Sequence, residues 1–126
     1  MGGLKTLFVA LLIAAPIAGP ARADDPLLRE FANCAGRLSA QMEHQWLIGD
    51  TESETTQKWR ASMISVLEAL MPTGSGKQVL AWRIDAKMAH ASLLTRATFN
   101  DDPEDADWAG RQAEMIIAGC NSLILG

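Results

Sequence analysis

Cys34 and Cys120 are the only cysteines in this sequence of 126 residues, and they suggest the first chemistry to consider. Neither belongs to a Cys-x-x-Cys or Cys-x-x-Cys-His motif, so thioredoxin-like redox chemistry and covalent haem attachment both lack their signature. In an oxidising compartment two such cysteines are expected to pair. We therefore predict a structural disulfide between Cys34 and Cys120, with two free buried thiols or an intermolecular bridge as the alternatives.

Metal binding is the next chemistry to consider, because an acidic run begins at Asp101 and the chain has two histidines. An EF-hand loop that starts at Asp101 needs Gly at its sixth position and Glu at its twelfth, where this chain has Ala106 and Gln112. His44 and His90 fall off the apolar stripes of their segments and at different depths, so we expect exposed histidines rather than haem ligands. The methionines recur at helical spacing, which favours core packing over a copper site. We expect no metal and no cofactor.

Catalytic motifs are not found in the sequence either. It contains no Gly-x-Ser-x-Gly elbow, no His-Glu-x-x-His and no phosphate-binding loop. We therefore expect a protein that is not an enzyme.

Residues 1–23 have the pattern of a bacterial export signal. Lys5 provides a positive start, residues 7–19 are almost wholly apolar, and Ala21-Arg22-Ala23 is a small-x-small cleavage site. No cysteine follows that site directly, so we expect a soluble periplasmic or secreted product without a lipid anchor. Residues 24–126 are enough for one domain.

The charge balance restricts the kind of partner. The whole chain has 11 basic and 15 acidic side chains, and removal of the signal with Lys5 and Arg22 leaves 9 basic against 15 acidic, a net charge of −6. This balance argues against a nucleic-acid partner. Beyond the signal no apolar stretch approaches the ~20 residues that span a bilayer, so we do not expect a membrane-spanning protein.

Four segments with helical periodicity must position these residues, and no segment alternates like a strand. Asp25 and Asp102 are the expected N-caps of the first and fourth segments, and Gly49 is the expected C-cap of the first. Thr51-x-x-Glu54 and Ser75-x-x-Gln78 read as capping boxes for the other two. In the third segment we expect Leu80, Ile84, Met88, Ala91 and Leu94 to face the core. The expected helices are Pro26–Ile48, a second from Thr51 to Pro72, a third over 77–98, and a fourth from Pro103 nearly to the last residue.

Short connections between such helices predict an all-α fold, an antiparallel up-down four-helix bundle. In this topology the first and fourth helices are antiparallel, and Cys34 and Cys120 lie at similar depth from one end, which is compatible with the predicted disulfide. We expect the small residues Ala35, Gly36 and Gly119 to let these two helices approach closely.

The opposite end of the bundle should gather three tryptophans beside acidic side chains. Core closure is one interpretation of Trp46, Trp59 and Trp108, and a recognition surface is the other, because Trp is enriched at binding hot spots and an acidic rim steers a basic partner. The candidate partner-binding residues are Trp46, Trp59, Trp108, Asp101, Asp102 and Asp105.

The sequence thus favours a small exported protein that binds another protein, as an accessory, inhibitory or immunity-type factor of the bacterial envelope. In its general plan, though in no particular motif, it resembles small helical periplasmic immunity proteins. The alternative is a periplasmic carrier of a small ligand, a metal ion or haem, with a cavity between the helices.

Overall fold

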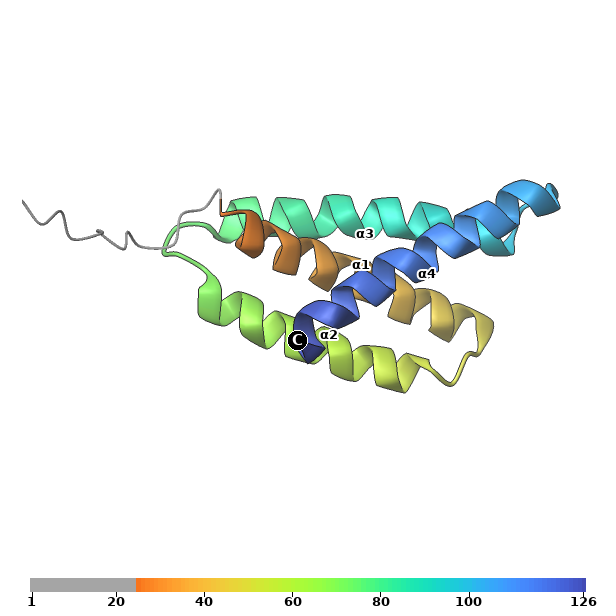
Figure 1. The fold of residues 1–126 in the computed structure, drawn as a ribbon. Coiled ribbons are helices and arrows are strands. Elements are labelled where there is room, and N and C mark those ends of the chain that lie inside the picture. Colours follow the sequence, from red (N-terminus) through yellow and green to blue (C-terminus); the bar gives the residue numbers. More distant parts are fainter. Residues whose placement is uncertain (1–24) are drawn as a thin grey trace, which may run out of the picture.

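The computed structural model describes residues 25–126 and contains four α-helices (Figure 1). The helices confirm the predicted segments and the all-α fold class, and no strand occurs in this part of the chain. The predicted export signal lies outside the described residues. The helices span Pro26–Ile48 (α1), Ser53–Leu70 (α2), Gly76–Thr98 (α3) and Pro103–Leu125 (α4).

The helix starts that rest on Asp and Pro agree with the prediction. The Asp25 carboxylate accepts from the amide of Leu27, and Asp102 caps α4 in the same way. The two predicted capping boxes are wrong. Before α2, the Glu52 amide donates to the Asp50 carboxylate rather than to Thr51. Before α3, the Ser75 hydroxyl donates back to the Pro72 carbonyl. Each of these side chains therefore stabilises the turn before its helix instead of the first turn within it.

The four helices run up and down as predicted, with α1 at the centre of the arrangement. Figure 1 shows α2 and α3 on opposite sides of α1, while α4 crosses α1 diagonally from the end of α3 towards α2. α1 packs most extensively on α3 and α2, and no Cα atom of α2 lies within 8 Å of one in α3. The bundle therefore has one open side, between α2 and α3.

Small residues explain why α1 can hold the central position. Ala32, Ala35 and Ala40 are buried, and Gly36 lies against the α3 backbone, where a side-chain carbon would clash with the Arg83 carbonyl. The expectation that Gly36 and Gly119 bring α1 and α4 together is wrong. Gly36 serves the α1–α3 contact instead, and a side-chain carbon on Gly119 would meet nothing within 4 Å.

The orientation of α3 also differs from the prediction. Val79, His90 and Leu94 are its buried side chains, whereas Leu80, Ile84 and Met88 are at least half exposed. The close contact of the α3 backbone with Gly36 fixes the rotation of this helix about its axis. A continuous apolar stripe is consequently left on the surface.

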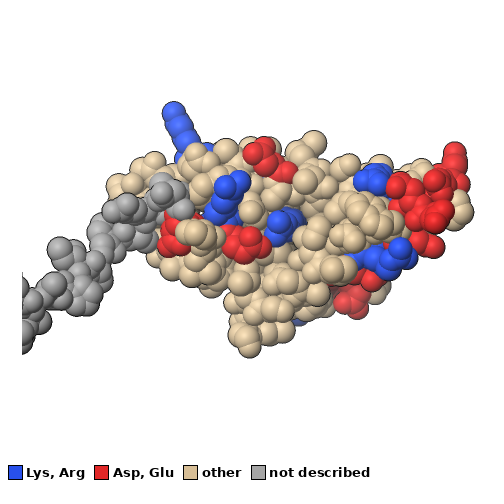
Figure 2. All heavy atoms as spheres, turned by 45° about the horizontal axis from the view of Figure 1, so that its top comes forward, with Lys and Arg blue, Asp and Glu red and all other residues tan. Residues whose placement is uncertain are grey.

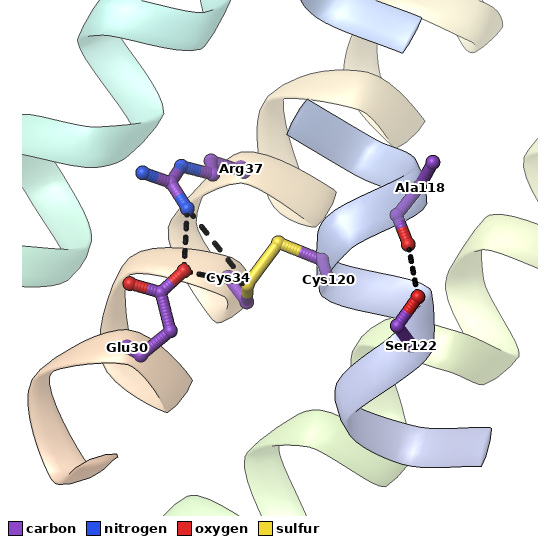
Figure 3. Close-up of a disulfide and its surroundings, with 6 residues drawn as sticks. All are labelled: Glu30, Cys34, Arg37, Ala118, Cys120 and Ser122. Atoms are coloured by element: carbon purple, nitrogen blue, oxygen red, sulfur yellow. Dashed lines mark hydrogen bonds and ion pairs between the residues drawn. A yellow bond between two sulfur atoms is a disulfide. The ribbon is translucent and has the colours of Figure 1, made fainter. Parts of the chain in front are cut away.

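The predicted disulfide between Cys34 and Cys120 is present and joins α1 to α4, with its Cα atoms 5.4 Å apart (Figure 3). Both cysteines are buried within the main core cluster, and an ion pair between Arg37 and Glu30, 2.9 Å long, lies beside them. Such buried disulfides are typical of oxidising compartments. The core cluster lies mainly at this end of the bundle. Its members are Leu28, Phe31, Ala32, Cys34, Ala35, Leu38, Met63, Leu67, Val79 and Cys120.

None of the four helices within residues 25–126 is both long enough and apolar enough to cross a membrane.

Candidate functional site

The candidate site lies at the end of the bundle where the α1–α2 and α3–α4 turns meet the solvent, which we call the two-turn end (residues 45–54 and 96–108). Figure 1 shows both turns at the same end of the molecule, separated from each other across its width. Figure 2 shows acidic side chains gathered at this end, with basic side chains close by. The main core cluster lies towards the other end, so fewer apolar contacts are available here to bury large side chains.

The first corner is formed by the end of α1. Trp46 is 55% exposed and Leu47 71% exposed, and Ile48 follows them at the helix end. Gly49 then ends α1 in the left-handed conformation, which turns the chain sharply and leaves these three side chains without cover. A depression of about 510 Å³ runs beside Trp46 over the α1–α2 turn. It is bordered by Gln45, which is buried and whose Oε1 atom has no hydrogen-bond partner within residues 25–126.

The second corner is formed by the end of α3 and the start of α4. Phe99 is 62% exposed and Trp108 45% exposed. The guanidinium of Arg96 lies over the Trp108 ring, 5.2 Å from its centroid, and donates to Asp105 through Nη2 over 2.6 Å. This arrangement fixes the orientation of the indole by a cation–π contact and an ion pair.

The three acidic residues of the candidate set have different roles. Asp102 accepts hydrogen bonds from the amides of Glu104 and Asp105 and so caps α4, while Asp101 is exposed beside it. The hydrogen bond from Arg96 lowers the pKa of Asp105 below its ordinary value, and Asn100 also donates to this carboxylate. Two of the three carboxylates therefore stabilise the corner, and Asp101 remains available at the surface.

Trp59 does not join the other two tryptophans at the surface. It is half-buried and packs against the core cluster, so it fills space between the helices. The structure thus places Trp46 and Trp108 on separate corners of one end and Trp59 half-buried against the core cluster. Leu47 and Ile48, which lie at the end of α1 and off its apolar stripe, were not predicted; apolar side chains next to a helix cap were the available signal. Phe99 lies at the end that helix order predicts, but it was not among the predicted binding residues.

The histidines depart from the expectation of exposed rings. His44 is half-buried and bonds Thr98, whereas His90 is only 2% exposed. His90 Nε2 lies 2.9 Å from the side-chain Oε1 atom of Gln41 and donates to it, which leaves Nδ1 without a partner in the described region. Burial, and secondarily the positive charge of Arg37, lowers the pKa of His90 to about 4. The ring is therefore neutral at physiological pH, and it ties α3 to α1.

Two further hollows lie along the helices. A cleft of about 390 Å³ between α3 and α4 is lined mostly by apolar or small side chains, with Gln41, Glu114 and Asn121 as polar members. A second hollow of about 220 Å³ lies on the open side of the bundle and is called the α2–α3 groove below. It is lined by Gly36, Ser39, Glu43, Arg60, Leu80, Arg83, Ile84 and Lys87.

The described residues offer no group of three or more His, Cys, Asp or Glu side chains that could hold a metal ion. Comparison of the chain with known protein families, curated proteins and solved structures finds no match.

Proposed function

We propose that this protein is exported to the bacterial periplasm or beyond, where it acts without catalysis by binding another protein through the two-turn end. The observation that carries the proposal is the exposure of five large apolar side chains at this one end. They are Trp46, Leu47, Ile48, Phe99 and Trp108. Large exposed apolar areas bordered by polar groups are typical of interaction sites, and tryptophan contributes strongly at such interfaces.

The surroundings of the two tryptophans support a docking role. Trp108 is held in place by Arg96, so little conformational freedom would be lost when a partner covers it. The carboxylates of Asp101, Glu104 and Asp107 are exposed next to it and would attract a partner with basic groups at its rim. The buried disulfide fits an oxidising compartment, which is where an export signal over residues 1–23 would deliver the chain.

The test is to capture partners of the tagged protein in its native host after photo-crosslinking, with Trp46→Ala and Trp108→Ala as test variants. Met115→Ala is a matched control, because Met115 is also exposed and apolar but lies in the middle of α4. We expect both tryptophan variants to lose a partner that the unmodified protein and the Met115 variant retain. If all four proteins yield the same partners, the two-turn end is not the docking face.

The export part of the proposal needs a separate measurement. The mass of the protein recovered from the periplasm or the medium should correspond to a chain that begins at Asp24, with two hydrogens fewer than the thiol form. A chain that retains residues 1–23 in the cytoplasm would refute this part.

A further inference from the structure

The α2–α3 groove lies on the side of α1 that faces away from α4. On α1, the side that faces α4 contains Cys34 and Gln41. At about 100° per residue, the roughly opposite side of α1 contains the residues that line the groove, Gly36, Ser39 and Glu43. Figure 1 shows α2 and α3 on opposite sides of α1, and no Cα atom of α2 lies within 8 Å of one in α3, so no helix of residues 25–126 closes this side of the bundle.

One wall of the groove is apolar over a length that suits a helix. Leu80 and Ile84 line the groove from α3, and Met88 continues their stripe one turn further along the helix; all three are at least half exposed. Eight residues of helix separate the first from the last, a distance of about 12 Å. A partner helix of two to three turns would cover this stripe with apolar side chains at matching intervals.

The charges of the groove indicate what else the partner must carry. Lys87 pairs with Glu43 over 2.7 Å, but neither Arg60 nor Arg83 contacts a carboxylate within residues 25–126. Arg60 is held at the groove by a 2.7 Å hydrogen bond from Nε to Ser39. The chain as a whole has a net charge of −4, so this concentration of cations runs against its overall charge. Two copies joined symmetrically through this groove would place the same cations against each other, which disfavours self-association.

We propose that the α2–α3 groove binds an acidic amphipathic helix of a partner protein. The apolar face of that helix packs on Leu80, Ile84 and Met88, and its flanking carboxylates pair with Arg60 and Arg83. Arginine is well suited to this role, because its guanidinium binds a carboxylate through two parallel hydrogen bonds. This surface is distinct from the two-turn end.

The experiment is a selection of displayed helical peptides on the oxidised protein, from a library of chains of about 20 residues, long enough to form a helix. We expect the selected peptides to combine an apolar stripe with flanking Asp or Glu. We expect the Arg60→Gln/Arg83→Gln double variant to bind them about tenfold more weakly than the unmodified protein. Arg111→Gln, on the exposed surface of α4, is the charge-matched control and should bind them like the unmodified protein.

Three results would overturn the proposal. The first is that the selected peptides show no excess of acidic residues. The second is that the double variant and the Arg111→Gln control bind the peptides with equal affinity. The third is a dimer in sedimentation that Ile84→Glu dissociates, which would make a second copy the occupant. If the double variant does not fold, the salt dependence of binding to the unmodified protein decides, because ion pairs weaken as salt is added. The Trp46→Ala variant should bind the peptides normally, so this test is independent of the two-turn end.

Discussion

Opening the Cys34–Cys120 disulfide should remove a large part of the stability of this protein. The two cysteines are 86 residues apart, and the chain-entropy relation then gives a stabilisation of about 4.6 kcal/mol at 25 °C, because the crosslink restricts the unfolded chain. Domains of this size have a total unfolding free energy of about 5–15 kcal/mol. Reduction should therefore lower the melting temperature by about 20 °C or more.

The assay compares thermal unfolding of the oxidised and reduced protein by circular dichroism. Both sulfur atoms are buried in the core, so reduction has to be carried out in denaturant, and the reductant has to be kept during refolding. The Cys34→Ala/Cys120→Ala variant provides a second comparison. It should be less stable than the reduced protein by about 1 kcal/mol or more, because it also loses the buried sulfur atoms.

The result that would refute this reasoning is a melting temperature that falls by less than about 5 °C on complete reduction. The unfolded chain would then be restricted without the crosslink, or α1 and α4 would hold together through packing alone. A reduced protein that does not refold at all would be consistent with a loss of stability close to the total unfolding free energy.

Three further predictions concern single residues. Gly36→Ala should lower the unfolding free energy by about 1–3 kcal/mol or more in urea titration, because the added carbon meets the α3 backbone, with Lys87 N at 3.0 Å. Gly119→Ala is the control: its added carbon meets nothing within 4 Å, so it should raise the unfolding free energy by about 0.5–1 kcal/mol. Similar effects of the two substitutions would contradict the Gly36 contact. His90 has a pKa lowered from 6.5 to about 4, so the folded state binds fewer protons than the unfolded state between these values. The unfolding free energy should therefore decrease by about 2 kcal/mol from pH 7 to pH 5 and continue to fall towards pH 4. His90→Gln should remove this decrease, and His44→Gln should keep it. If the decrease persists in His90→Gln, other titrating groups cause it. Asp102→Ala should destabilise the protein by about 0.5–2 kcal/mol, measured by urea titration, through loss of the α4 cap, and Asp101→Ala, at the exposed position next to it, should change little.

The helices and the disulfide could be predicted because their signals are local or covalent. Asp25 and Pro26 specify the start of α1, and Asp102 and Pro103 specify the start of α4, through the free amides of the first turn and the fixed φ of proline. Two cysteines in one short domain leave a single intramolecular pairing, and the up-down topology brings them to the same depth. The two capping boxes failed because Asp50 and the Pro72 turn offered better local hydrogen bonds.

The candidate site could be predicted only in outline. That Trp46 and Trp108 lie at one end of the bundle follows from helix order and length. Their exposure, and the burial of Trp59 against the core, depends on how far each helix is rotated about its axis. The exposure of Leu47, Ile48 and Phe99 depends in the same way on which neighbours reach the helix ends.

The sequence by itself determined four helices, their bounds and the covalent connection between the first and the last. Only the tertiary structure decided which face of α3 is buried. Val79 on the buried side of α3 and the Leu80, Ile84 and Met88 stripe on its exposed side are both apolar, so periodicity alone does not choose between them. The choice is made by the fit of the α3 backbone against Gly36, a contact between residues 47 positions apart in the sequence. This contact also buries His90 and leaves the α2–α3 groove open.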